Sequence, residues 1–201
     1  MSGQIAAWHA EHLNFARLLR LLEEQVARFA RGESADYTLM EDIVHYLRHF
    51  PDLHHHRYEN EVYARMRERE PALAPLVARL LQEHRVIAAC GERLAELLDA
   101  VLGDSPVVRA DLEAAAATYL VYYRAHIDAE ETQMLPRVAA TLRAADWAGI
   151  ADSVAEQGRG DPLFGPHAEQ RFSALRLEIE RQAASAPPRQ ASPVDGLSPV
   201  I

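Results

Sequence analysis

Apolar residues in the N-terminal part of the chain recur at alternating intervals of three and four residues. The residues that share this stripe are Ile5, Trp8, His12, Phe15, Leu19, Leu22, Val26 and Phe29. This spacing is typical of an α-helix that buries one face in a helical bundle. A helix is therefore expected from about residue 5 to Gly32, where glycine can adopt the left-handed conformation that ends a helix.

The same pattern occurs a second time. Every position of the stripe recurs 72 residues later, so that His84 stands where His12 stood; the second stripe is Val77, Leu80, His84, Ile87, Gly91, Leu94, Leu98 and Val101. A helix predicted over residues 36–69, kinked at Pro51, follows the first stripe. Another, predicted over residues 106–141, follows the second. This repeat of a helical hairpin predicts an all-α fold, an antiparallel up-and-down four-helix bundle.

The C-terminal part adds further helices to the bundle. A short helix is expected over residues 146–157, a turn-rich link over 158–166, and another amphipathic helix from residue 164 or 167 to about 181. We expect one domain over residues 1–182, followed by a tail over 183–201. The tail is rich in Pro, Ser and Ala and is predicted to be disordered or laid over the surface.

Charge and composition exclude several classes of partner. A net charge of −9 argues against nucleic acid, which needs a basic face. No apolar run is long enough to span a membrane. The single cysteine, Cys90, excludes an internal disulfide and suits a reducing cytoplasm, and the N-terminus lacks the features of a secretory signal. A cytoplasmic protein is expected, and homo-oligomerisation stays open.

Two His/Glu pairs indicate a metal centre. His55 and Glu59 stand four residues apart on one helix, as do His126 and Glu130 on another, so each pair shares a helical face. Counting residues outwards from the predicted turns places six side chains at one level of the bundle: His12, His55, Glu59, His84, His126 and Glu130. An unpaired buried polar group costs about 1–3 kcal/mol, and four imidazoles exceed two carboxylates. A metal centre would satisfy all six; the alternative is a metal-free core of His–Glu hydrogen bonds.

The ligand set also restricts the metal. Six ligands are too many for one tetrahedral zinc ion, and four imidazoles are too nitrogen-rich for calcium or magnesium. Two first-row ions bridged by Glu59 and Glu130 use the whole set. Two iron ions with an oxo or hydroxo bridge are the first choice, with manganese or a mixed pair as alternatives.

The motifs resemble those of the hemerythrin family, in its bacterial HHE cation-binding branch. The resemblance rests on Glu11-His12, His55 to Glu59, Glu83-His84, His126 to Glu131 and the DPLFG sequence at 161–165. It covers roughly residues 5–140 and the DPLFG extension. It implies a carboxylate-bridged di-iron centre in a four-helix bundle, which acts on oxygen, nitric oxide or peroxide, or serves as an iron store or sensor.

The chain departs from this family in one position. Where the oxygen-carrying members have a histidine four residues after His84, this chain has Ala88. The resemblance therefore implies a four-histidine variant poorly suited to reversible oxygen transport. Glu83, Glu131 and His167 are candidates to complete the metal shell.

Other histidines and tyrosines near these motifs are not expected to bind the metal. We expect five histidines to be solvated or to lie beside the site: His9, His45, His49, His54 and His56. A shift of one residue at the Pro51 kink would exchange His54 or His56 with His55, although the repeat favours His55. Tyr119 and Tyr123 are expected to pack in the core, with hydrogen bonding to a bound ligand as a secondary hypothesis.

The favoured function is the binding or sensing of a small oxidant or gas. The alternatives are an enzyme that decomposes peroxide or oxidises ferrous iron, and a protein that stores or donates iron for the repair of iron centres. No general base, nucleophile or nucleotide-binding loop is evident in the sequence, so an ordinary organic substrate is not expected.

Overall fold

The computed structural model describes residues 3–154, 161–166 and 169–185. These residues form helices joined by turns, and none of them lies in a β-strand. The all-α class predicted from the sequence is confirmed for this part of the chain. It agrees with a composition dominated by Ala, Leu, Arg and Glu, which are strong helix formers.

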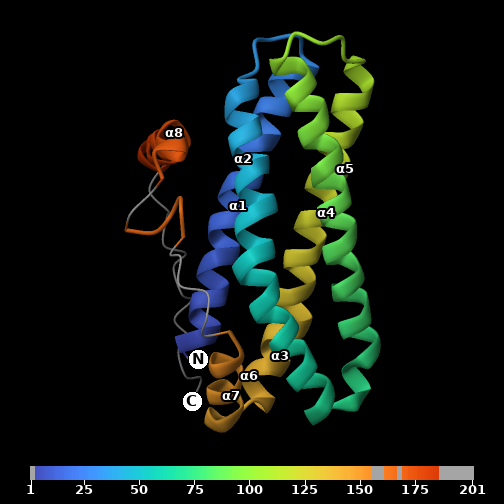
Figure 1. The fold of residues 1–201 in the computed structure, drawn as a ribbon, viewed down its shortest axis with the longest axis vertical. Helices are drawn as coiled ribbons and strands as arrows, with labels where there is room; N and C mark the ends of the chain where they lie inside the picture. Colours follow the sequence, from blue (N-terminus) through green and yellow to red (C-terminus); the bar gives the residue numbers. More distant parts are fainter. Residues whose placement is uncertain (1–2, 155–160, 167–168, 186–201) are drawn as a thin grey trace, which may run out of the picture.

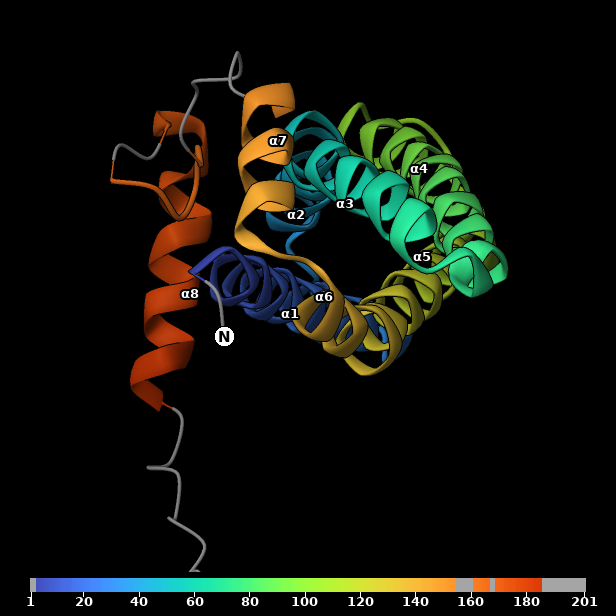
Figure 2. The same cartoon turned by 90° about the horizontal axis from the view of Figure 1, so that it is seen from below.

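Four long helical segments lie side by side (Figure 1). They are α1 (Gly3–Ala30); α2 (Tyr37–Phe50) with η1 (Pro51–His55) and α3 (His56–Arg69); η2 (Pro71–Leu73) with α4 (Ala74–Leu102); and α5 (Arg109–Ala129) with η3 (Glu130–Met134) and α6 (Leu135–Thr141). Seen end-on, they surround a common interior (Figure 2). The helix bounds predicted from the periodicity lie within a few residues of these.

Two of the long segments change their helical form in mid-course. Both η1 and η3 are π-helical, with hydrogen bonds to the fifth residue instead of the fourth. The kink predicted at Pro51 takes this form, since proline lacks the N–H that an α-helix requires there. A π-helical turn holds more residues than an α-helical turn. Residues after it therefore point to a different side of the helix than 3.6 residues per turn would predict.

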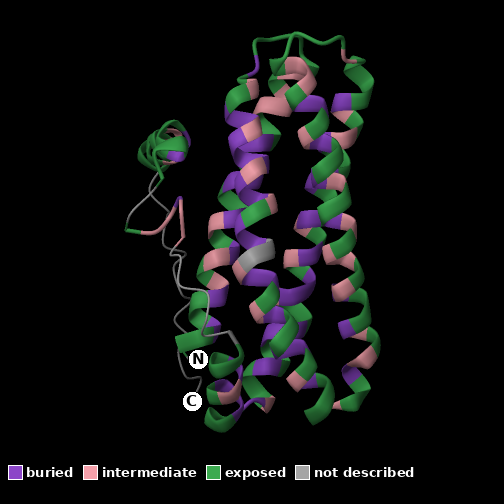
Figure 3. Cartoon of the chain, viewed as in Figure 1, coloured by how far each residue is buried: buried purple, intermediate pink, exposed green. Residues whose placement is uncertain are grey.

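The apolar interior divides into two clusters. One contains Phe15, Ile43, Leu94 and Tyr119, and the other contains residues such as Val62 and Val138. Along each long segment, the His/Glu positions fall between residues of the first cluster and residues of the second. Buried positions recur along all four long segments (Figure 3). The polar level is thus closed above and below by apolar side chains.

The C-terminal extension lies against the outside of this core. It comprises α7 (Ala144–Val154), which contacts α3, then η4 (Gln170–Phe172) and α8 (Ser173–Ser185), which contacts α2. Asp161 Oδ1 of the DPLFG sequence accepts hydrogen bonds from the backbone N–H groups of Leu163 and Phe164, both at 2.8 Å. The hydroxyl of Tyr46 donates to Asp161 Oδ2 at 2.9 Å, which attaches the extension to α2.

The last described helix of the extension continues slightly past the predicted end of the domain. Helix α8 ends at Ser185, three residues after the domain end expected at residue 182. The rest of the expected tail lies outside the described residues, as does His167. Among the described helices, none is both long enough and apolar enough to cross a lipid bilayer.

Candidate metal centre

The six residues singled out by the repeat come together in the interior. They are His12 (α1), His55 (η1), Glu59 (α3), His84 (α4), His126 (α5) and Glu130 (η3). Both carboxylates are fully buried, with 0% exposure, and the histidines are buried or nearly so. Each long segment therefore contributes at least one side chain to this level.

The first group consists of His12, His55, Glu59 and Glu130, each with one ligand atom within 4.8 Å of the others. Nε2 of His12 lies 3.1 Å from Oε2 of Glu130. Nε2 of His55 lies 2.6 Å from Oε1 of Glu59, and the two Nε2 atoms are 3.1 Å apart. Two imidazoles and two carboxylates thus surround one small space.

The second group shares Glu59 with the first and adds three histidines, His56, His84 and His126. Nε2 of His84 lies 3.2 Å from Oε2 of Glu59 and 3.0 Å from Nε2 of His126. One oxygen of Glu59 therefore faces the first group and the other faces the second. Oε2 of Glu130 also lies near both, 3.4 Å from Nε2 of His126.

His56 lies in the interior, contrary to the expectation from the sequence. It was expected to be solvated or beside the site, but it is buried and stacks on His84, with ring centroids 4.1 Å apart at 22°. Consecutive residues His55 and His56 both reach the interior at the junction of η1 and α3. The site therefore gathers five imidazoles, one more than the four predicted from the sequence. Ala88 is exposed.

Three of the four carboxylate oxygens at the centre have no hydrogen-bond partner. Both oxygens of Glu59 and Oε2 of Glu130 are buried and have no hydrogen-bond partner, although imidazole nitrogens lie at the short distances given above. The nitrogens and oxygens converge on shared spaces instead of forming aligned donor–acceptor pairs. An unsatisfied buried group costs about 1–3 kcal/mol, so this donor set fits metal ions better than a metal-free core.

A second set of carboxylates binds the outer nitrogens of the histidines. Nδ1 of His55 donates to Glu11 at 2.6 Å, and Nδ1 of His126 donates to Glu83 at 3.0 Å. Nδ1 of His12 donates to Glu131 at 2.6 Å. Such bonds fix the proton on Nδ1 and leave the Nε2 lone pair for a metal ion. Glu83 and Glu131, candidates to complete the shell, lie behind the imidazoles instead.

Each outer carboxylate comes from a different helical segment than its histidine. Glu11 directly precedes His12 on α1 but binds His55 of η1. Glu83 directly precedes His84 on α4 but binds His126 of α5. Glu131 of η3 likewise reaches across to α1. The acidic neighbours of the ligands thus act across the bundle.

Burial and charge shift the pKa values of the central histidines and carboxylates in different directions. Burial and the charge of Glu59 raise the pKa of Glu130 to about 8. Burial disfavours the cation of His55, yet Glu59 and Glu11 outweigh it and raise the pKa to about 9. Burial lowers the pKa of His126 to about 2. Burial would raise the pKa of Glu59, but the adjacent imidazoles hold it well below its usual value. At neutral pH the metal-free site therefore holds protons that a metal ion must displace.

Two aromatic residues make polar contacts with the centre. The hydroxyl of Tyr63 donates to Oε1 of Glu130. Nε1 of Trp8 donates to Nε2 of His12 at 3.1 Å. In the sequence Trp8 belongs to the apolar stripe, and only its position one turn before His12 indicates the contact. Tyr119 and Tyr123 are buried in the first apolar cluster, in agreement with their predicted packing role.

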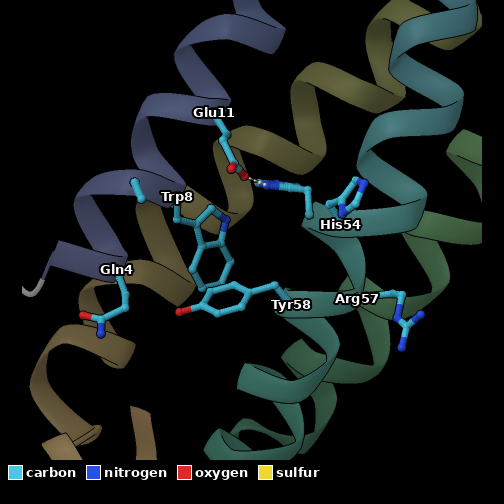
Figure 4. Close-up of a pocket in the computed structure, with 8 residues that line it drawn as sticks. Gln4, Trp8, Glu11, His54, Arg57 and Tyr58 are labelled. Carbon is cyan, nitrogen blue, oxygen red and sulfur yellow. Dashed lines mark hydrogen bonds and ion pairs between the residues drawn. The ribbon is translucent and has the colours of Figure 1, made fainter. Parts of the chain in front are cut away.

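A pocket of about 330 Å³ approaches the centre from the outside (Figure 4). It lies between α1 and the η1–α3 segment and is lined by Gln4, Ala7, Trp8, Glu11, His54, His55, Arg57 and Tyr58. Its inner wall includes Trp8 and the hydrogen-bonded pair of Glu11 and His55. The pocket therefore ends beside the first group.

Comparison with known proteins gives one family. No curated protein matches this chain. The family model described as the hemerythrin HHE cation-binding domain matches residues 4–138. This range includes every side chain of both groups and ends before the C-terminal extension. The chain therefore belongs to the hemerythrin family, whose HHE domain binds metal cations.

Proposed function

We propose that the chain binds two iron ions inside an antiparallel up-and-down four-helix bundle. His12 and His55 would hold one ion, and the three histidines of the second group, His56, His84 and His126, would hold the other. Glu59 and Glu130 would be shared. The observation that carries this proposal is Glu59: it is buried, lacks hydrogen bonds, and presents one oxygen to each group.

Iron is preferred because imidazole and carboxylate ligands with open positions suit redox-active first-row metals. Manganese or a mixed pair is the alternative. When bound, an iron pair supplies electrons and vacant coordination positions for a small molecule. An oxo or hydroxo bridge would occupy one position on each ion.

The protein's own groups would orient and protect this centre. The outer carboxylates fix the imidazole rings through Nδ1, and Tyr63 fixes Glu130 through Oε1. The apolar clusters on either side keep water from the shared carboxylates. Such a shell favours reaction with molecules small enough to enter a closed interior.

The proposed role is to bind or sense a small oxidant or gas, namely oxygen, nitric oxide or peroxide. The first group has two imidazoles against three in the second, so its ion would have more open positions. The outer pocket ends beside the first group, which supports entry of the small molecule at the ion of that group. A reducing, cytoplasmic setting is also proposed, since it would keep Cys90 as a free thiol and iron available.

The proposal is tested by the iron content and by its dependence on Glu59. Wild-type protein is expected to hold two iron ions, and Glu59→Gln should lose most of both. Glu61→Gln, at an exposed position on the same helix, is the matched control and should retain both. Optical spectra of the reduced protein with oxygen, nitric oxide and peroxide then separate stoichiometric binding from turnover. One tightly held zinc ion per chain, after growth with ample iron, would contradict the proposal.

A further inference from the structure

The indole N–H of Trp8 is directed at an atom that a metal ion would need. Nε1 of Trp8 lies 3.1 Å from Nε2 of His12, and that nitrogen also lies 3.1 Å from Oε2 of Glu130 and from Nε2 of His55. Trp8 and His12 are one helical turn apart on α1, so both point to the same face. The donor thus lies at the edge of the first group.

A metal ion and Trp8 would compete for the same acceptor. The hydrogen bond from Trp8 uses the Nε2 lone pair of His12, because Nδ1 donates to Glu131. A metal ion bound to Nε2 takes that lone pair. The N–H then needs another acceptor, since Trp8 is only 2% exposed and a buried donor without a partner costs about 1–3 kcal/mol.

Packing prevents the indole from turning to a new partner. Its ring contacts His55 edge-on, with centroids 6.3 Å apart at 87°, and Tyr58 at 6.2 Å and 84°. Tyr63 packs on it as well, at 6.3 Å. Figure 4 shows the indole between α1 and Tyr58, at the inner wall of the pocket. The N–H therefore keeps its direction towards the first group.

We propose that Trp8 donates a hydrogen bond to the small anionic ligand that binds on the metal ion of His12 and His55. This inference rests on the proposed function and assigns a ligand-selecting residue to one side of the centre. Ligands with a strong acceptor atom, such as azide, gain from the contact. Trp8 is thus a binding residue for the exogenous ligand and not a metal ligand.

The test is an azide titration of the oxidised, iron-loaded protein, followed by its charge-transfer absorption. Two variants remove the N–H: Trp8→Phe, and replacement of Trp8 by β-(3-benzothienyl)alanine, which has the same shape with sulfur in place of N–H. The azide dissociation constant should rise about tenfold in both, in line with the loss of one hydrogen bond to a charged acceptor. The absorption band should shift, and the iron content should stay at the wild-type value.

Trp147 provides the matched control. It is also buried and also contacts Tyr58, with rings stacked at 6.4 Å, but it belongs to α7 and has no described contact with either group. The same replacements there should leave azide affinity unchanged. Iron-loaded Trp8 variants with wild-type azide affinity would overturn the inference alone, since a protein carboxylate would then be the acceptor. Wild-type protein without iron would overturn the proposed function and this inference together.

Discussion

His54 and His56 flank the same histidine, yet they differ in where their rings lie. His56 is buried in the second group, whereas the ring of His54 lies tilted against Phe50 and lines the outer pocket. We predict that His56→Ala reduces the iron content to about one ion per chain, because it removes one of three imidazoles from one ion only. His54→Ala is the control and should keep two ions. Equal iron content in the two variants would show that His56 is not a ligand.

Metal binding must displace protons from His55 and Glu130, so the metal affinity should depend on pH. In the metal-free protein the raised pKa values of His55, about 9, and Glu130, about 8, keep both groups protonated at neutral pH. Each proton that the metal displaces makes the apparent affinity rise by about tenfold per pH unit, until the pH passes the pKa concerned. Competition with a chelator of known proton affinity, from about pH 6 to about pH 10, measures this slope. A flat profile would mean that both groups are already deprotonated without metal.

Sequence spacing could find these side chains only where the helix is regular. His12 and His84 lie in uninterrupted α-helices, so a count from the turns places them correctly. His56 was missed because the π-helical η1 changes the directions of the residues at its end. The contacts of Glu83 and Glu131 were missed for another reason. Each directly adjoins a predicted metal ligand in the sequence, which suggests that both neighbours bind the same ion. In the structure each of these carboxylates binds a histidine of another helical segment instead.

At the scale of elements, the DPLFG segment attaches the extension through a tight turn. Gly165 donates its backbone N–H to the carbonyl of Asp161 at 3.1 Å, and a Cβ at Gly165 would collide with that carbonyl oxygen. Gly165→Ala should therefore destabilise the protein by about 1–3 kcal/mol, as overpacking does. Thermal unfolding and limited proteolysis measure the effect, and iron content should not change.

Gly149 in α7 is the matched control for this substitution. A Cβ there would meet its nearest neighbour, Arg65 Nη2, at an ordinary 3.6 Å. Gly149→Ala should be neutral or stabilising, because alanine favours a helix over glycine by about 1 kcal/mol. If both variants unfold at the wild-type temperature, the turn does not hold the extension in place.

The long helices were predictable and the attachment of the extension was not. Apolar periodicity and helix-ending residues such as Gly32 act locally, and so they can be recognised in the sequence. The hydrogen bond from Tyr46 to Asp161 joins residues 115 positions apart, and no local pattern signals it. The same holds for Arg171, which binds Glu41 and Asp42 of α2.

For the whole molecule, the extension contributes part of the main apolar cluster. Leu163, Phe172 and Leu175 are buried within it. Burying each side chain is worth about 1.5–3 kcal/mol, and each kcal/mol corresponds to about 2–4 °C in a protein of this size, so removing residues 161–201 should lower the melting temperature by about 10 °C or more. Removing only residues 186–201 should change it little, given their Pro, Ser and Ala content.

Iron content separates stability from metal binding in these truncated proteins. Both should retain the metal, because every proposed ligand lies between His12 and Glu130. Equal melting temperatures for the two would show that the extension adds no stability. Loss of iron from the shorter protein, in its folded state, would show instead that the extension supports the centre.

The crossed pairing of the outer carboxylates has a mechanical consequence. Glu11 ties α1 to η1, Glu83 ties α4 to α5, and Glu131 ties η3 back to α1. An imidazole that shifts when a ligand arrives therefore pulls on a helix other than its own. Two of these hydrogen bonds measure 2.6 Å, and the neighbouring interior is close-packed, so we expect such a pull to be transmitted and not absorbed locally. A displacement that begins at one coordination position would thus reach the outer surface of a neighbouring helix, where another molecule could detect it.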